Sequence, residues 1–153
     1  MADTPKPPMH PATIAAQAAG AIDTETAGVV PAIHMATTFM RDAEYAPMNA
    51  ENIYLRSHNE NTRVAERLLS ALEGAADTLL FPSGMAAVAA VFRTVPTGGA
   101  VVVQSQIYWG TTAWIREFCA RRQIALHEVE ASDAEALAAV CAQHRPALVW
   151  VET

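Results

Sequence analysis

Residues 98–104 read Gly-Gly-Ala-Val-Val-Val-Gln, a two-glycine turn followed by a short run of apolar residues. A continuous apolar run of this length predicts a strand over 100–104, of the kind that is buried on both faces of a parallel sheet. Comparable runs at 78–81, 124–129 and 147–152 predict three further strands. The sequence therefore favours a mainly parallel sheet with helices on both faces.

Helix-forming segments lie between these strands. Over 61–73, apolar residues recur at the spacing of one helix face, and we expect Asn61 to cap the start and Gly74 the end. Further helices are expected at 83–94, 111–122 and 133–144. Strands and helices alternate along the chain, which is typical of an α/β fold.

The first part of the chain is less regular. Residues 1–11 are rich in proline and are expected to form a mobile leader, followed by a short helix over 13–19 and an extended segment over 27–39. We therefore expect two regions, a leader and arm over 1–60 and an incomplete α/β domain over 61–153.

Composition places the chain among soluble globular proteins, because 52% of its residues are hydrophobic and 17% are charged. A net charge of −6 with scattered acidic residues argues against a nucleic-acid partner or an anionic membrane. No apolar run approaches the ~20 residues that cross a bilayer, and the leader lacks the pattern of a secretory signal. The cytoplasm is the expected compartment.

Cysteine and lysine usage restrict the possible chemistry. Cys119 and Cys141 have neither CxxC spacing nor a histidine ladder nearby, so we expect buried free thiols and no metal site. Among the basic residues, Lys6 is the sole lysine and all the others are arginines. A mechanism that requires a buried amine cannot be completed by these residues alone.

Residues 81–87, Phe-Pro-Ser-Gly-Met-Ala-Ala, lead from an apolar run through a tight turn into a helix. Free amides at a helix N-terminus, together with the positive end of the helix dipole, form a phosphate site. Ser83 is expected to cap the helix, and Gly84 would let a ligand approach the backbone. A plain N-capped helix would show the same pattern.

Three other sets of residues are candidates. In an extended segment Tyr54 and Arg56 face the same side, and arginine can grip a phosphate with two parallel hydrogen bonds. Tyr108 and Trp109 follow the strand over 100–104, where aromatic rings can stack on a planar ligand. Glu152 ends an apolar strand, where a carboxylate usually lies at the mouth of a site. Each set also has a plain structural alternative. The first would be a solvated loop pair, the second a hydrophobic anchor of the loop, and the third a solvent-facing strand end.

By their order and spacing, these motifs resemble the cystathionine-γ-synthase-like family of transsulfuration enzymes. This is the Cys/Met-metabolism group of fold-type-I pyridoxal-phosphate proteins, and the resemblance covers about 27–153. It rests on Gly28-Val29-Val30-Pro31-Ala32-Ile33, Thr37-Thr38-Phe39, Tyr54-x-Arg56-x-x-Asn59, Leu72-Glu73-Gly74 and Ser83-Gly84-Met85. It implies that the chain is the N-terminal part of the large domain of an aminotransferase-like, PLP-dependent enzyme.

The resemblance implies roles for five residues around the cofactor. Gly84 and Met85, in the turn that Ser83 opens, would donate backbone amides to the phosphate of pyridoxal 5'-phosphate (PLP). Tyr108 would stack on the pyridine ring and is a candidate for proton transfer. Glu152 matches the acid of the family's Glu-x-Pro-x-Asn-Pro segment.

The resemblance also implies partners and a reaction. Tyr54 and Arg56 would reach the cofactor phosphate of a neighbouring subunit, which implies a homodimer or homotetramer. The substrate would be an amino acid such as cystathionine, in which a C–S bond at the β- or γ-carbon is broken or made. The family's aspartate on the pyridine nitrogen and its Schiff-base lysine would lie beyond Thr153, so the chain is expected to be a fragment that is inactive alone.

Two departures from the family pattern stand out. The chain has Asn59-Glu60-Asn61 where the family usually has Asn-Pro-Thr, which implies a less rigid loop. Trp109 is bulky where small residues usually follow the tyrosine, which implies a different substrate preference.

Two other functions stay open. A non-catalytic fragment or subunit-pairing module would use the loop of Tyr54 and Arg56 without chemistry. A nucleotide-binding α/β domain would fit the alternation of strands and helices, but no GxGxxG or GxxxxGK[ST] motif follows any predicted strand.

Overall fold

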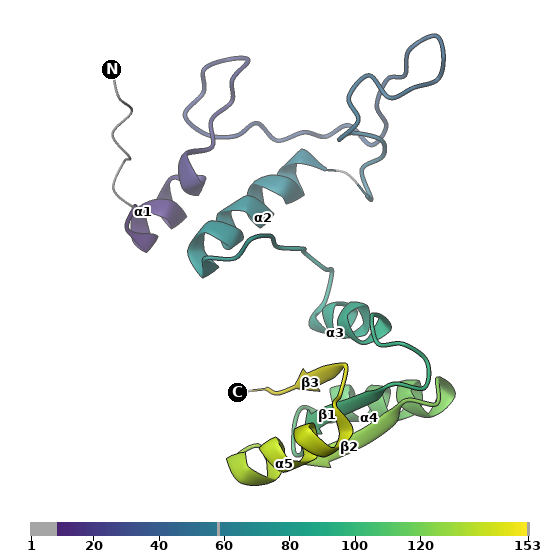
Figure 1. Cartoon of the computed structure of the whole chain (residues 1–153). Helices are drawn as coiled ribbons and strands as arrows, with labels where there is room; N and C mark the ends of the chain where they lie inside the picture. Colours follow the sequence, from purple (N-terminus) through teal and green to yellow (C-terminus); the bar gives the residue numbers. More distant parts are fainter. Residues whose placement is uncertain (1–8, 58, 153) are drawn as a thin grey trace, which may run out of the picture. The chain divides into compact units, whose positions relative to one another are not determined.

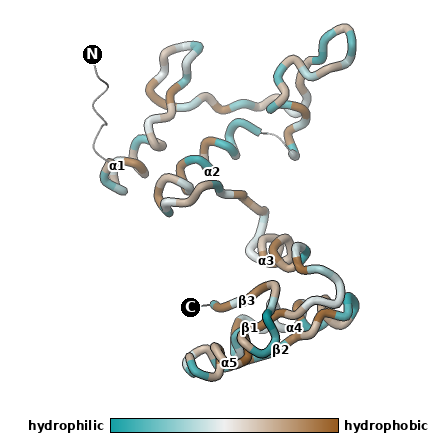
Figure 2. Tube along the Cα trace, in the orientation of Figure 1, coloured by the Kyte–Doolittle hydropathy of each residue, from teal (hydrophilic) through white to brown (hydrophobic). Residues whose placement is uncertain are grey.

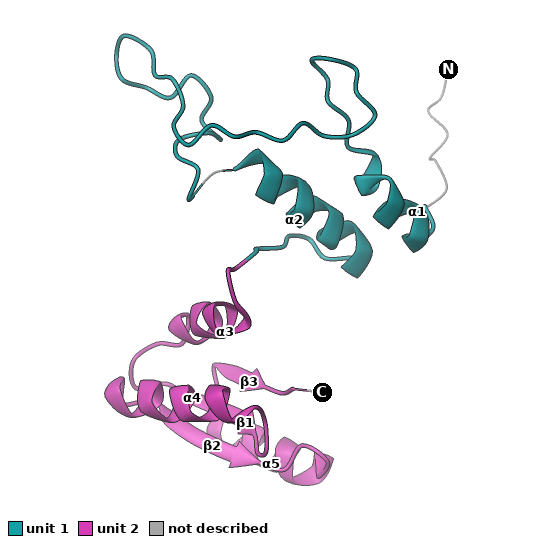
Figure 3. Ribbon diagram, turned by 180° about the vertical axis from the view of Figure 1, so that it is seen from behind, with its two compact units in different colours: residues 1–80 teal, residues 81–153 magenta. Residues whose placement is uncertain are grey.

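The computed structural model describes residues 9–57 and 59–152, which fall into two compact units, residues 1–80 and 81–153 (Figure 3). Their elements follow each other in the order labelled in Figure 1. These are α1 (Pro11–Ala16), the 3-10 turn η1 (Ala18–Gly20), α2 (Glu60–Glu73), α3 (Gly84–Arg93), β1 (Ala100–Gln104), α4 (Trp109–Arg121), β2 (Ala125–Val129), α5 (Ala134–His144) and β3 (Leu148–Trp150).

The second unit contains a parallel sheet with the strand order β2-β1-β3. Val102 at the centre of β1 lies opposite His127 on one side and Val149 on the other. Parallel strands need long connections, which α4 provides from β1 to β2 and α5 provides from β2 to β3. The predicted α/β class and parallel strands are confirmed.

The expectation of four strands is wrong for the described residues, which form three. Residues 78–81 make no strand, although their apolar side chains suit one. Among the described residues no strand lies beside this segment to complete its backbone hydrogen bonds. The Leu80 amide donates instead to the Glu66 carboxylate, at 2.9 Å.

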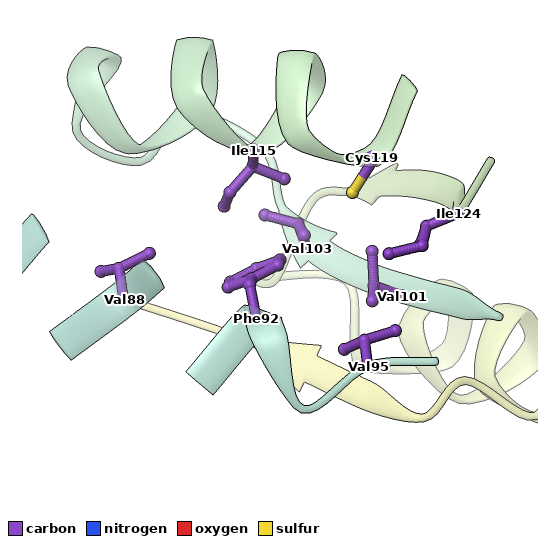
Figure 4. Packing of buried hydrophobic residues seen from close by; sticks show 8 residues of the cluster. All are labelled: Val88, Phe92, Val95, Val101, Val103, Ile115, Cys119 and Ile124. Atoms are coloured by element: carbon purple, nitrogen blue, oxygen red, sulfur yellow. The ribbon is translucent and has the colours of Figure 1, made fainter. Parts of the chain in front are cut away.

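The core of the second unit lies between β1 and two helices. Val101 and Val103 point to one face of the sheet, where they meet Ile115 of α4 and Phe92 of α3 (Figure 4). Val102 points to the opposite face and is also fully buried. Because α5 packs against β1 and β2 on that side, helices cover both faces, as predicted (Figures 1 and 3).

Polar caps place the helix ends largely where the sequence predicts them. The Ser83 hydroxyl accepts a hydrogen bond from the Ala86 amide at the start of α3, and Asp133 caps α5 in the same way. Gly74 ends α2 with a φ of 62°, which glycine adopts without strain. The expected cap at Asn61 is wrong, because the Asn59 side chain accepts from the Asn61 amide and caps α2.

In the first unit, the Asn61 side chain has a different task. It accepts from the His34 amide at 3.0 Å and donates to the His34 carbonyl at 2.9 Å, which fixes the extended arm to the start of α2. Apolar side chains along the arm stay exposed, and Figure 2 shows hydrophobic colour along this stretch. They include Val29, Val30, Ile33 and Met35, which are 67–87% exposed.

The predicted leader and first helix need correction. Helix α1 starts at Pro11, because proline fits the first position of a helix, where no amide partner is required. It ends at Ala16, before the expected Ala19, since Ala18 and Ala19 adopt positive φ values. Residues 1–8 of the predicted leader lie outside the described residues.

Contacts within the chain place α2 in the same unit as α1. The expected division into an arm over 1–60 and a cofactor domain from 61 onward concerns the assembled protein and stays a prediction. Both cysteines are free thiols, with Cys119 buried and Cys141 half-buried, and burial raises the pKa of the Cys119 thiol. Within the described ranges, no helix combines the length and hydropathy required to cross a membrane.

Candidate functional site

A hollow of about 630 Å³ opens in the second unit where β1 and β3 end and α3 begins. Ligands of open α/β sheets bind at the carboxyl ends of strands, so this is the expected place for a site. The walls come from α3, the start of α4 and the end of β3. They are Ser83, Gly84, Met85, Ala87, Val88, Tyr108, Thr111, Trp150 and Glu152.

The N-terminus of α3 forms one wall of the hollow. Ser83 is extended, and it satisfies the Ala86 amide with its hydroxyl and the Ala87 amide with its carbonyl. Gly84 and Met85 follow as the first two helical residues, whose amides have no partner inside a helix. No acidic residue lies in this first turn. These two amides are therefore available to an anion that enters the hollow.

Gly84 leaves open space on the ligand side. A Cβ added to this glycine would meet no atom within 4 Å, and its φ is not positive. Neither the backbone conformation nor packing within the second unit requires a glycine here. The open space permits a ligand to approach the backbone closely.

Tyr108 also lines the hollow, directly before α4. The residue is 56% exposed, and among the described residues its hydroxyl has no hydrogen-bond partner. Trp109 lies beside it, with ring centroids 5.8 Å apart, and is even more exposed. An accessible phenol face of this kind can stack on a flat ring.

Glu152 ties the end of β3 to the Tyr108 segment. One carboxylate oxygen accepts from the Tyr108 amide at 3.1 Å, and the other accepts from Nε1 of Trp150 at 3.0 Å. The Glu152 amide donates to the Gln104 side chain at the end of β1, also at 3.0 Å. The acid thus joins three chain segments that border the hollow.

Sequence reasoning assigned no site role to four residues of the walls, Ala87, Val88, Thr111 and Trp150. Thr111 is buried and donates its hydroxyl to the Met85 sulfur at 3.6 Å, which links the starts of α4 and α3. It follows Tyr108 by three residues, and this helical spacing could have revealed it. Nothing in the sequence distinguishes Trp150 from any other residue of an apolar strand.

Tyr54 and Arg56 lie in the first unit and contact each other. The Arg56 guanidinium carbon lies 5.2 Å from the centre of the Tyr54 ring, a cation–π contact. They meet through a turn, in which the Ser57 amide donates to the Tyr54 carbonyl, and not through the extended segment that we expected. Arg56 is exposed and forms no ion pair with any described residue, so its donors are available to an anion.

The fold and the hollow define a class of protein, an α/β domain in which a helix N-terminus and an accessible tyrosine line one hollow. Residues 12–153 match the model of the Cys/Met metabolism PLP-dependent enzymes, and the chain belongs to this family. The cofactor of the family is pyridoxal 5'-phosphate, as the resemblance implies.

Individual relatives agree with this assignment. The chain is 30% identical to pig cystathionine gamma-lyase over 82% of its own length and 30% of the relative's. It is 32% identical to a chloroplastic cystathionine beta-lyase of Mimosa pudica, over 79% of this chain and 26% of that protein. The chain thus spans about a third of the length of the curated relatives that it matches.

Solved structures show the same fold. The cystathionine gamma synthase of Xanthomonas oryzae pv. oryzae, solved in complex with cystathionine, superposes with a TM-score of 0.83 and 29% identity. The match covers 96% of this chain and 38% of that one. A cystathione gamma lyase of Micromonospora echinospora is 31% identical with a TM-score of 0.78, over 94% of this chain and 36% of that chain.

The residues present fit the cofactor in three respects. The unpartnered amides of Gly84 and Met85 suit its phosphate, and the open space at Gly84 lets the phosphate come close. The exposed face of Tyr108 suits its ring.

Proposed function

We propose that the complete protein is a PLP-dependent carbon–sulfur lyase or sulfur transferase of transsulfuration, which acts on a sulfur amino acid such as cystathionine. The single observation that carries this proposal is the hollow, whose lining combines the first two residues of a helix with an accessible tyrosine. Family membership and the cystathionine bound by a structural neighbour support the substrate class.

Each candidate residue has a proposed task in this reaction. The amides of Gly84 and Met85 hold the cofactor phosphate, and Ser83 keeps the turn in place by capping α3. Tyr108 lies against the cofactor ring, and its free hydroxyl can accept or give a proton near the substrate. When bound, PLP supplies an electron sink for the bond that breaks at the substrate's α-carbon.

The proposal also includes a neighbouring subunit. Tyr54 and Arg56 reach the cofactor phosphate of a second copy in a homodimer or homotetramer. The exposed Arg56, with its planar set of donors, suits a phosphate, and the exposed apolar side chains of the arm suit burial against another subunit. Such an assembly would function in the cytoplasm, the compartment expected from the sequence.

The unit with the hollow has no amine that could carry the cofactor, since Lys6, the sole lysine, belongs to the Pro-rich leader and matches the family's lysine neither in position nor in context. Residues 1–153 alone would therefore be inactive. The unit with the hollow contains no lysine. For residues 1–153 by themselves, this observation favours the alternative function, a non-catalytic pairing module.

Trapping the cofactor tests the proposal. The complete gene product and residues 1–153 are incubated with PLP, reduced with cyanoborohydride and mapped by mass spectrometry, with a Lys6→Arg variant as control. We expect a stable adduct on an internal lysine of the complete protein. In residues 1–153 we expect no adduct other than a nonspecific one on Lys6, which the Lys6→Arg variant removes. A complete protein without a specific adduct, and without the visible absorbance of bound cofactor, would contradict the proposal.

Product analysis then separates the two reaction types. Elimination releases a thiol, ammonia and a keto acid from cystathionine, whereas replacement joins a thiol to an activated homoserine. If the PLP-loaded complete protein forms neither set of products, the proposed substrate class is refuted.

A further inference from the structure

Gly110 lies beneath the Tyr108 ring. A Cβ added to this glycine would lie 2.6 Å from Cε1 of the ring, 3.0 Å from Cζ and 3.2 Å from the hydroxyl oxygen. Carbon atoms do not approach to 2.6 Å without a shift of one partner. Any side chain at position 110 would therefore displace the ring from its position.

The backbone at position 110 does not itself require glycine. Gly110 is in the first turn of α4 and has no positive φ, and alanine is the better helix former. The three atoms nearest to a Cβ at this position, beyond its chain neighbours and the helix backbone, all belong to the Tyr108 side chain. The ring is thus the structural reason for a glycine at this position.

Glu152 fixes the backbone of the same tyrosine. Its carboxylate accepts from the Tyr108 amide, while its second oxygen is engaged by Trp150. Trp150 is anchored in turn, since its ring lies 5.7 Å from that of the fully buried Phe92. The backbone of Tyr108 is therefore held to the core through Glu152, each of whose carboxylate oxygens already accepts one hydrogen bond.

We propose that Gly110 and Glu152 are positioning residues for Tyr108. Glu152 sets where the backbone of the tyrosine lies, and Gly110 provides the space into which its ring folds. This inference rests on one part of the proposed function, namely that the Tyr108 ring contacts the cofactor. It gives Glu152 a task through Tyr108 in place of a direct contact with the cofactor.

A double-mutant cycle on the complete protein tests the part of Gly110. Gly110→Ala is made in the natural background, in Tyr108→Ala and in Tyr108→Phe, and thermal unfolding is followed without cofactor. We expect the alanine to raise the midpoint in Tyr108→Ala, where the clash is gone, and to raise it less or to lower it where a ring is present. Equal shifts in all three backgrounds would overturn the inference. If Gly110→Ala alone fails to fold, rescue by Tyr108→Ala supports the inference and continued failure overturns it.

The part of Glu152 is tested with Glu152→Gln. The amide has one acceptor oxygen for two donors, the Tyr108 amide and Trp150 Nε1. We expect an altered visible circular dichroism of bound PLP in Glu152→Gln, and a smaller alteration when Trp150→Phe has already removed one donor. An equal alteration in both backgrounds, or none, would contradict the positioning role.

The proposed function and the positioning role of Gly110 and Glu152 can be refuted independently of each other. If the natural protein binds no PLP, the proposed function fails, while unfolding without cofactor still reports the contact between Gly110 and Tyr108. If PLP binds normally and the cycle shows no coupling, only the positioning role fails.

Discussion

The imidazole rings of His127 and His144 lie face to face, with their centroids 3.7 Å apart. His127 belongs to β2 and His144 to the last turn of α5, so the pair joins a helix to an edge strand. Nε2 of His127 is buried and has no hydrogen-bond partner among the described residues. Burial, and then the charge of His144, lower the pKa of His127 below its ordinary value of 6.5.

This pair predicts a loss of stability in mild acid. Because the folded state lowers the pKa of His127, the unfolded chain binds a proton more readily. The stabilising contribution is present above pH 6.5 and is lost as the pH falls through that value toward the pKa of the folded state. We expect the thermal midpoint of the complete protein to fall over this range, and His127→Gln to reduce the fall. An equal fall in His127→Gln and in the natural protein would contradict this assignment.

Two substitutions of Ser83 are predicted to separate its effect on stability from its effect on cofactor binding. Ser83→Ala removes the cap of α3 and should cost about 1 kcal/mol in urea unfolding. Ser83→Asp keeps a good cap but places a negative charge beside the phosphate, so it should retain stability and weaken PLP binding. Titration of PLP by absorbance checks the second effect. Equal PLP affinity of the aspartate variant and the natural protein would contradict a phosphate at this turn.

Gly84→Ala is expected to leave the fold intact and to damage cofactor binding. The new methyl group meets no atom within 4 Å in the protein, and alanine favours the helix. It would, however, hold the phosphate away from the amides, and losing one charged hydrogen bond weakens binding by about tenfold or more. Urea unfolding without PLP and a PLP titration check the two statements. A variant that binds PLP normally would place the phosphate elsewhere.

Subunit complementation tests whether Arg56 acts across an interface. Arg56→Ala and Ser83→Asp are each expected to lower PLP occupancy, because each damages one side of the same composite site. Mixed assemblies of the two variants should regain occupancy in about a quarter of the sites, since half the dimers are mixed and one of their two sites is intact. Arg56→Lys keeps the charge but loses the planar fork, and should bind with intermediate affinity. No recovery on mixing would place both residues in one subunit's site.

The sequence predicts those features whose cause is local. The cap at Ser83 and the left-handed end at Gly74 follow from neighbouring backbone groups, and the strand at 100–104 follows from its own apolar run. The predicted strand at 78–81 fails because a strand exists only beside a partner, and apolar composition does not supply one.

The same limit applies to the candidate site. The segments of Ser83, Tyr108 and Glu152 could be selected by their places at strand and helix ends. The bond between the last two joins residues 44 positions apart, and it depends on the order of strands in the sheet. The role of Gly110 can be recognised only when the orientation of the Tyr108 ring is known.

Trp150 gives the hollow a natural optical reporter. Its indole forms part of the wall, and its Nε1 is fixed by Glu152, so a bound chromophore would lie within efficient range for energy transfer. Quenching of its emission could follow cofactor entry and release in real time, with no dye attached to the protein.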